Sequence, residues 1–129
     1  MPAGRAGKIA AGAGIAPFIH YRTKNIMSAT LKHIVFWKLK EHAEGADKAS
    51  NALQLKALLD SCAGIVPGML RFEAAIAQPG LEATYDVVLN SEFASAAALE
   101  AYQNHPTHVA IKPFVGAVRE SRQCMDYLS

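Results

Sequence analysis

The alternation of apolar and polar side chains along residues 31–39 predicts a β-strand. One face of this strand is expected to carry Leu31, His33, Val35, Trp37 and Leu39. The other face places Ile34 and Phe36 between lysines, and a period of two residues is that of a strand. Because apolar side chains occupy both faces, we expect both faces to be at least partly buried.

Residues 47–63 have the periodicity of an amphipathic helix. Apolar side chains recur there every three or four positions, at Ala52, Leu55, Leu59 and Cys62. Gly64 follows as a natural stop, because glycine readily adopts the left-handed conformation that ends many helices. A second helix is predicted over residues 96–103, where the Ser95 hydroxyl can cap the first turn.

A further helical segment is expected to begin at Pro106, because proline suits the first turn of a helix. Pro113 should then bend or break that segment, since its ring replaces a backbone N–H that the helix needs. Three more strands are predicted over residues 69–77, 85–93 and 119–128. In the first of them, the apolar face is expected to consist of Leu70, Phe72, Ala74 and Ile76.

The predicted order of elements is strand, helix, strand, strand, helix, strand. This is the ferredoxin-like split β-α-β arrangement, an α+β fold with an antiparallel four-stranded sheet and helices on one face. We expect one domain over residues 30–128, a length sufficient for a single core. In a monomer the sheet face without helices would stay bare, and the simplest cover for it is the same sheet of a second copy.

Residues 1–29 differ from the rest of the chain in composition. They are rich in Ala and Gly and contain four basic residues and no acidic ones. The remainder contains nine basic and eleven acidic residues, so the formal charges of the two parts are +4 and −2. We interpret residues 1–29 as a disordered or misannotated N-terminal extension. For residues 1–26, a targeting segment, a disordered tail and a start-site artefact, with translation beginning at Met27, all stay open.

Composition excludes several classes of protein. Hydrophobic residues make up 51% and charged residues 19%, which is typical of a globular domain. No apolar run reaches the roughly 18 to 20 residues of a membrane span, and no basic stripe interleaved with aromatics indicates nucleic-acid binding. Cys62 and Cys124 lack the spacing of a metal or redox motif. We expect both cysteines to be reduced and packed as small hydrophobes, which fits a cytoplasmic location.

Candidate chemistry is concentrated at the junction between the two helical segments of the C-terminal half. Tyr102 and His105 share a helix face at a spacing of three, and His108 can return to that face if the proline turn keeps the chain close. His33 is expected to point under the helices and to form a hydrogen bond with a backbone carbonyl or with Tyr102. Imidazole and phenol side chains gathered in this way can exchange protons, the imidazoles close to neutral pH.

Several short segments together resemble the stress-responsive A/B barrel family, also called the dimeric alpha+beta barrel or Dabb family. They are Lys32-His33-Ile34-Val35, Ile65-Val66-Pro67-Gly68, Tyr85-Asp86, Tyr102-Gln103-Asn104-His105-Pro106-Thr107-His108 and Met125-Asp126-Tyr127. The resemblance implies a homodimer whose two sheets face each other as a barrel, with a cleft between each sheet and its helices. Most members have no assigned reaction, and the family name reflects induction under stress in some plants.

A few relatives within this resemblance are polyketide cyclases. Their pocket tyrosine and histidine match Tyr102 and His108, and their strand histidine matches His33. The sequence departs from the cyclases at Val87, where they can carry a further pocket histidine.

Two functional interpretations follow. The leading one is a small dimeric A/B barrel protein of undetermined activity that binds a small apolar or aromatic molecule in the sheet-to-helix cleft. The alternative is a cofactor-independent, polyketide-cyclase-like enzyme for aldol-type cyclisation or a related proton transfer. In that enzyme His108 would be the base, Tyr102 would donate a hydrogen bond to the enolate, and His33 would be a further proton-transfer group.

No metal or organic cofactor is expected. The other residues expected to line the cleft are Trp37, Leu39, Val87 and His105, the last mainly as a cap at the helix junction.

Overall fold

The computed structural model of the chain describes residues 29–129, so the interpretations of residues 1–26 lie outside the described residues. Its elements are β1 (Leu31–Leu39), β2 (His42–Ala43), β3 (Ala46–Asp47), α2 (Lys48–Asp60), β4 (Met69–Ile76), β5 (Val87–Phe93), α3 (Ala96–Asn104), α4 (Pro106–Val118) and β6 (Arg119–Leu128). Apart from the two-residue strands β2 and β3, this is the predicted order. The ferredoxin-like α+β fold is therefore confirmed.

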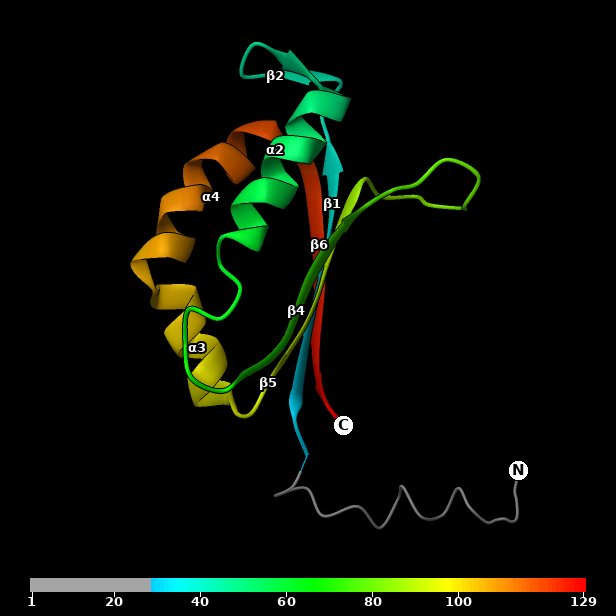
Figure 1. Cartoon of the computed structure of the whole chain (residues 1–129). Coiled ribbons are helices and arrows are strands. Elements are labelled where there is room, and N and C mark those ends of the chain that lie inside the picture. The colour runs from blue at the N-terminus through cyan, green and yellow to red at the C-terminus, as the bar shows by residue number, and fades with distance from the viewer. Residues whose placement is uncertain (1–28) are drawn as a thin grey trace, which may run out of the picture.

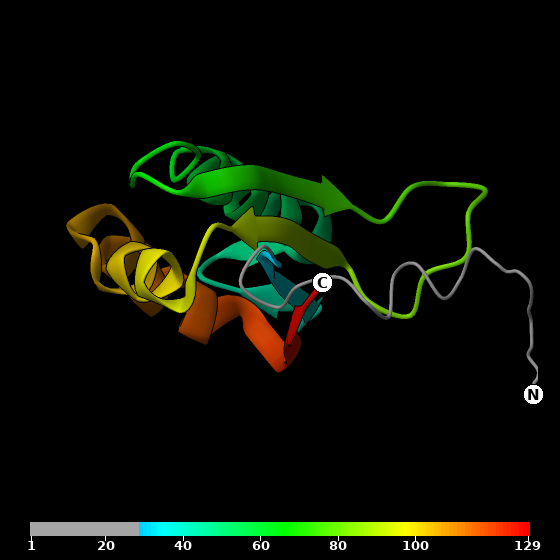
Figure 2. The ribbon, with the colours of Figure 1, turned by 90° about the horizontal axis from the view of Figure 1, so that it is seen from below.

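The four long strands form one antiparallel sheet in the order β4-β5-β1-β6. The first strand is central, and it pairs with β5 on one side and with the C-terminal β6 on the other. Figure 1 shows α2, α3 and α4 gathered on one face of this sheet, while no described element covers the opposite face. We call that opposite side the open face. The loop between β4 and β5 projects beyond the sheet, away from the helices (Figures 1 and 2).

The predicted apolar stripe of the first helix is confirmed. Its members Ala52, Leu55, Leu59 and Cys62 are all buried in the core. The helix begins where Asp47 caps it, with a carboxylate oxygen accepting a hydrogen bond from the Ser50 N–H at 2.9 Å. It ends at Asp60, three residues earlier than predicted, and turns lead to Gly64, whose φ of +77° needs glycine.

The apolar face predicted for β4 is wrong at its first position. The pairing register between β4 and β5 shifts between Met69 and Arg71, so Leu70 turns outward and is 56% exposed. Met69 packs against the core in its place. A register shift of one residue exchanges the two faces of a strand, which explains why simple alternation failed at this point.

The second crossover consists of two helices that meet at His105. This residue ends α3 and caps α4, because its Nδ1 accepts a hydrogen bond from the Thr107 N–H at 3.1 Å. The expected caps at Ser95 and His105 are thus confirmed. Helix α4 starts at Pro106 as predicted and continues through Pro113 to Val118, so Pro113 does not break it.

The two cysteines lie in different environments. Cys62 is buried, as predicted, but Cys124 is exposed, and neither forms a disulfide. The prediction for Cys124 is wrong because β6 is an edge strand of the sheet, and most of its side chains stay exposed.

Candidate functional site

A cavity of about 460 Å³ lies between the helix-side face of the sheet and the two C-terminal helices. We call it the helix-side cavity. Six apolar side chains stand in its wall, those of Val35, Trp37, Leu59, Leu89, Ile111 and Val115. Three side chains that can donate or accept protons also line it, namely His33, Tyr102 and His108. The structure thus brings together the three residues that the sequence singled out for chemistry, from β1, α3 and α4.

His33 is held by an acidic partner from the last strand. Its Nδ1 lies 2.6 Å from Oδ1 of Asp126, and the two residues are direct register partners of β1 and β6. The expected bond to Tyr102 or to a backbone carbonyl is therefore wrong, because the strand register supplies a carboxylate instead. A carboxylate accepts, so neutral His33 donates through Nδ1–H and keeps a lone pair on Nε2. The imidazole itself is buried, with only 4% of the residue exposed.

Tyr102 is the largest fully buried side chain at the site. Its ring packs against the rings of Phe72 and Phe93, each at 5.4 Å between centroids, and against His108 at 4.5 Å. Burial raises the pKa of the phenol well above its ordinary value of 10.0, and the nearby Cys62 raises it further. Tyr102 therefore stays protonated at neutral pH and can donate a hydrogen bond to a ligand oxygen.

His108 sits in the first turn of α4 and faces back towards α3. Its Nδ1 lies 3.0 Å from the Gln103 carbonyl oxygen, which can only accept, so Nδ1–H is the donor and Nε2 carries the lone pair. Burial lowers the pKa of His108 below its ordinary value of 6.5. The bond to Gln103 opposes this shift, while the positive charges of Lys112 and Arg122 add to it. A neutral imidazole in this tautomer is a base at neutral pH.

Three basic side chains also line the cavity, and none of them was predicted from the sequence. Lys112 comes from α4, while Arg119 and Arg122 come from β6, and all three are exposed. We call these residues the cationic rim. Their place at the cavity follows from the pairing of β6 with β1, which puts Arg119 opposite Leu39 and Arg122 opposite Trp37. The sequence alone does not show this register.

The residues predicted to line the cleft have different positions. Trp37 lines the helix-side cavity as expected. Leu39 and Val87 are fully buried parts of the core and do not border that cavity. His105 serves as the helix junction cap and is not in the cavity wall.

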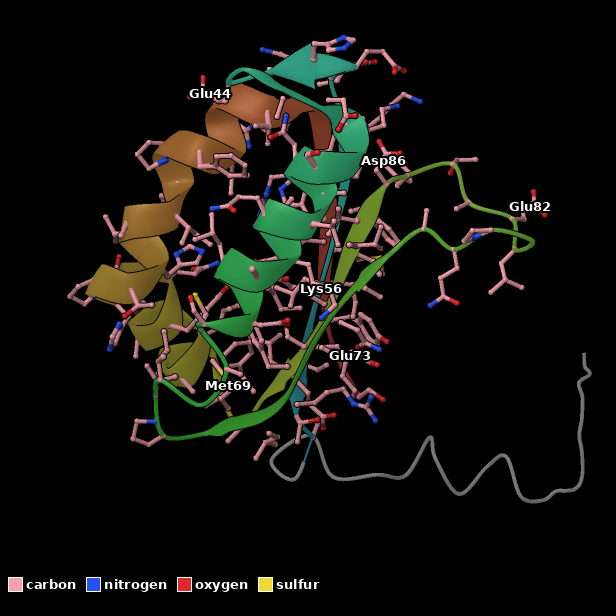
Figure 3. All side chains as sticks on the ribbon, turned by 45° about the horizontal axis from the view of Figure 1, so that its top comes forward. Glu44, Lys56, Met69, Glu73, Glu82 and Asp86 are labelled. Atoms are coloured by element: carbon pink, nitrogen blue, oxygen red, sulfur yellow. The ribbon has the colours of Figure 1, made fainter. Side chains whose placement is uncertain are left out.

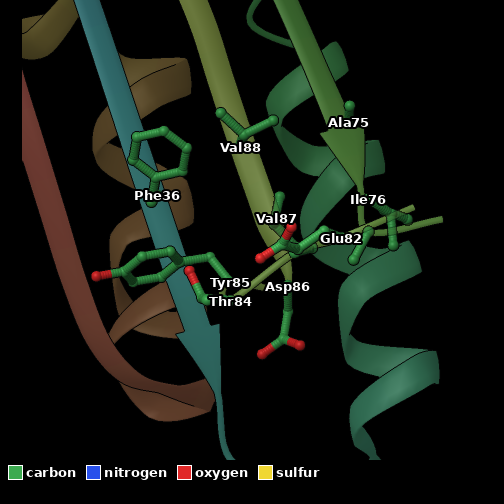
Figure 4. A pocket seen from close by; sticks show the side chains of 11 residues that line it. Phe36, Ala75, Ile76, Glu82, Thr84, Tyr85, Asp86, Val87 and Val88 are labelled. Carbon is green, nitrogen blue, oxygen red and sulfur yellow. The ribbon is translucent and has the colours of Figure 1, made fainter.

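A second cavity, of about 350 Å³, opens on the other side of the sheet. It lies beneath the β4–β5 loop, where the rings of Phe36 and Tyr85 approach to 5.3 Å beside Val88 (Figure 4). Glu82 stands in the projecting part of this loop, and Asp86 stands at its return to the sheet (Figure 3). Asp86 holds that return, because its carboxylate accepts a hydrogen bond from the Leu39 N–H at 2.7 Å.

Residues 29–129 contain neither a group of side chains suited to a metal ion nor a helix suited to crossing a membrane. No group of three or more His, Cys, Asp and Glu side chains in that range is arranged to hold a metal ion. None of the helices described there is long and apolar enough to cross a membrane.

The family model of the stress responsive A/B barrel domain matches residues 31–129. The chain belongs to this family. The match begins at the start of β1 and includes every residue of the helix-side cavity. The resemblance noted in the sequence is therefore confirmed at the level of the family.

Solved structures similar to this A/B barrel domain support the same fold. A dimeric ferredoxin-like protein of unknown function from Bacteroides fragilis is 28% identical, covers 76% of this chain and 94% of its own, and has a TM-score of 0.64. A Dabb family protein with a ferredoxin-like fold from Mesorhizobium loti is 25% identical, covers 78% and 97%, and has a TM-score of 0.55.

One similar structure belongs to a named enzyme. The hydroxynitrile lyase of Passiflora edulis is 20% identical, covers 79% of this chain and 94% of its own, and has a TM-score of 0.61. At this identity the likeness concerns the fold alone. No protein with a curated description matches the sequence significantly. The A/B barrel domain described here thus has a known fold and an undetermined activity.

Proposed function

We propose that this A/B barrel domain binds a small apolar or aromatic molecule in the helix-side cavity. The observation that carries the proposal is one cavity of about 460 Å³ in which apolar side chains of the sheet and helices surround three convergent polar ones, His33, Tyr102 and His108. Small-molecule sites in proteins commonly have this composition, because apolar walls supply affinity while a few polar groups fix orientation.

The polar groups define what the ligand should offer them. Tyr102 is a protonated donor, whereas His33 and His108 have their Nδ1 positions engaged, so the neutral form of either imidazole presents its lone pair on Nε2. A ligand with a carbonyl oxygen and a nearby acidic proton satisfies both kinds of group. A purely hydrocarbon ligand would leave buried polar groups without partners, which is costly.

A second candidate function is cofactor-independent proton transfer, as in a polyketide-cyclase-like reaction. It is favoured by the tautomer of His108, whose Nδ1–H is engaged by the Gln103 carbonyl so that Nε2 remains a base. In this reaction Nε2 removes a proton alpha to the ligand carbonyl, and the Tyr102 hydroxyl donates a hydrogen bond to the developing enolate oxygen. The enolate carbon can then attack a second carbonyl of the same molecule in an aldol-type cyclisation: a carbon–carbon bond forms, the carbonyl double bond becomes an alkoxide, and the alkoxide takes back the proton held on Nε2 of His108.

We also propose a homodimer whose subunits meet through their open faces. Phe36, Met125 and Tyr127 are 38%, 65% and 43% exposed on the sheet side that no described element covers. Burying such side chains against a second copy is favourable, and similar structures from Bacteroides fragilis and Thermobifida fusca are described as dimeric.

A cytoplasmic location, with both cysteines reduced, is proposed on the basis of the two free thiols.

The binding proposal is tested by filling the cavity from α4. Val115→Trp places a large ring in the cavity wall, whereas Val109→Trp makes the same change on the same helix at a position that is 46% exposed and outside the cavity. A panel of aromatic ketones and acids is titrated by calorimetry against the wild type and both variants. Binding should be lost only in Val115→Trp, and equal binding by all three proteins would contradict the proposal.

The enzymatic candidate needs a separate measurement. Compounds that bind are incubated with the protein, and ring closure or exchange of the alpha proton with deuterium is followed by NMR. His108→Gln should slow exchange by ~10²-fold or more if His108 is the base. Binding without exchange in the wild type leaves a binding module and removes the enzymatic candidate.

A further inference from the structure

The cationic rim gives the helix-side cavity two chemically different ends. Lys112, Arg119 and Arg122 stand exposed at the edge of the cavity, whereas Tyr102 and His33 are buried in it. The rim draws its side chains from both walls of the cavity, since α4 supplies the lysine and β6 supplies the two arginines. A molecule inside the cavity would therefore meet positive charge at one end and neutral groups at the other.

No acidic side chain among residues 29–129 forms an ion pair with any member of the cationic rim. Glu120 adjoins Arg119 in β6 without an ion pair to it, and the other acid of this strand, Asp126, is engaged by His33. The positive charge of Arg122 also reaches into the cavity, since it opposes the rise that burial causes in the pKa of Tyr102 and adds to the fall that burial causes in the pKa of His108. The rim charges are thus free to act on a ligand.

A hydrogen-bond donor beside the rim also lacks a partner. Trp37 is 5% exposed, and its indole nitrogen Nε1 is the buried side-chain polar atom of the described residues for which no acceptor is present. Trp37 and Arg122 are direct register partners on neighbouring strands, so their side chains leave the same face of the sheet side by side. A negatively charged oxygen is the acceptor that this pair of donors lacks.

We propose that the ligand of the helix-side cavity carries a carboxylate, which the cationic rim binds, while its apolar or aromatic body extends inward to Tyr102 and His108. This inference rests on the proposed function, because it specifies the molecule that the same cavity binds. Arginine guanidinium groups suit a carboxylate in particular, because two parallel N–H groups match its two oxygens.

The surroundings of the rim favour a carboxylate over a phosphate. Helix α4 ends at Val118, directly before Arg119, so this arginine of the rim lies at the carbonyl end of that helix. The helix dipole is negative at this end and disfavours a dianion more than a monoanion. The helix N-terminus, which commonly binds phosphate, is at Pro106, at the other end of α4.

The test compares matched charged and neutral probes. Affinities of 2-naphthoate, 2-naphthamide and 2-naphthyl phosphate are measured by calorimetry at pH 7.5 with the full chain, and decanoate and decanamide form a second pair. The acids should bind about tenfold more tightly than their amides. Arg119→Gln/Arg122→Gln should remove that advantage and leave amide binding unchanged. Lys38→Gln/Lys40→Gln removes the same charge at exposed positions outside the cavity and should change neither affinity.

Failure of the carboxylate can be told apart from failure of the cavity as a binding site. Equal affinity for acids and amides, or the same loss in both double variants, overturns the carboxylate while the cavity proposal stands. Tighter binding of 2-naphthyl phosphate than of 2-naphthoate also overturns it. Acid binding that survives Val115→Trp lies elsewhere on the protein and overturns it as well. If none of the five compounds binds, the inference and the proposed function both fail.

Discussion

Nδ1 of His33 lies 2.6 Å from Oδ1 of Asp126, so that a buried imidazole of the first strand is held by a carboxylate of the last strand. The Asp126 side chain is 42% exposed, and its own hydration is therefore largely retained. The principal effect of this contact is orientation, because it fixes which ring nitrogen of His33 carries the proton and which faces a ligand.

Replacement of Asp126 should reveal that orientation. Asp126→Ala removes the acceptor, and we expect a loss of about 1 kcal/mol in the free energy of unfolding together with a mixture of imidazole tautomers. Asp126→Asn keeps an acceptor oxygen, so it should lose less stability and retain the Nδ1–H tautomer. Chemical denaturation measures the stability, and nitrogen-15 NMR of the imidazole measures the tautomer. A wild type in which Nε2 carries the proton would contradict the geometry.

His108 should make the stability of the domain depend on pH. Its pKa is lower in the folded state than in the unfolded state, so the unfolded chain binds more protons as the pH falls below about 6.5. The resulting loss in the free energy of unfolding is absent well above pH 6.5. It grows as the pH falls towards the folded-state pKa of His108 and is constant below that pKa. Between pH 7.5 and 5.5 the wild type should therefore lose more stability than His108→Gln. Parallel curves for the two proteins would show that His108 is not buried in its neutral form.

Gly68 should be more sensitive to substitution than its positive φ alone predicts, because an added side chain would collide with α3. An added Cβ would lie 2.9 Å from the Cβ of Ala98 on α3, whereas Gly80 has a similar φ of +86° and nothing within 4 Å. Gly80→Ala should cost about 1 kcal/mol of folding free energy for the left-handed backbone, and Gly68→Ala should cost roughly 1 to 3 kcal/mol more through overpacking. Equal losses, measured by urea denaturation, would mean that α3 moves freely to make room.

A charge on the open face should separate the proposed dimer. Phe36→Glu places a carboxylate on the central strand among the side chains proposed to meet the second copy, and we expect a monomer of lower stability. Leu53→Glu is the matched control, because Leu53 is 65% exposed on α2, on the helix side of the domain. Light scattering during gel filtration measures the mass of each protein. A monomeric wild type, or a Phe36→Glu variant that stays dimeric, would count against the open face as the interface.

A chain that begins at Met27 should melt like the full chain. The described core consists of residues 31–118, and the first strand begins at Leu31. We therefore expect the melting temperatures of the two proteins to agree within about 4 °C, which corresponds to roughly 1 kcal/mol for a domain of this size. A larger difference in calorimetry would show that residues 1–26 contribute to the fold.

The parts of the fold that sequence could predict are those that depend on local patterns. The odd positions of β1 and the stripe of α2 were readable because burial follows a period of two or of 3.6 residues. Caps such as Ser95 and His105 were readable because a side chain bonds to a backbone group only two or three residues away. Leu70 and Cys124 were predicted wrongly. Neither the register shift in β4 nor the position of β6 at the edge of the sheet can be recognised from the neighbouring residues in the sequence.

The same distinction applies to the site. Tyr102 and His108 could be paired from the sequence because they flank one short junction between helices. Asp126 lies 93 positions from His33, and Arg122 is brought beside Trp37 by the same pairing of β1 with β6. These partners depend on which strand lies next to β1 and in which register, which a single sequence does not reveal.

The central place of β1 also governs when during synthesis the sheet can be completed. This strand leaves the ribosome first, yet Leu31 pairs with Phe93 on one side and with Leu128 on the other. The backbone groups on both edges of β1 therefore stay unpaired until residues made much later are available. Pairings between such distant residues form slowly. A nascent chain stopped before Arg119 would contain every helix and three of the four long strands. It would nevertheless lack the carboxylate beside His33 and both arginines of the cavity, so the proposed ligand site is complete only once β6 has been made.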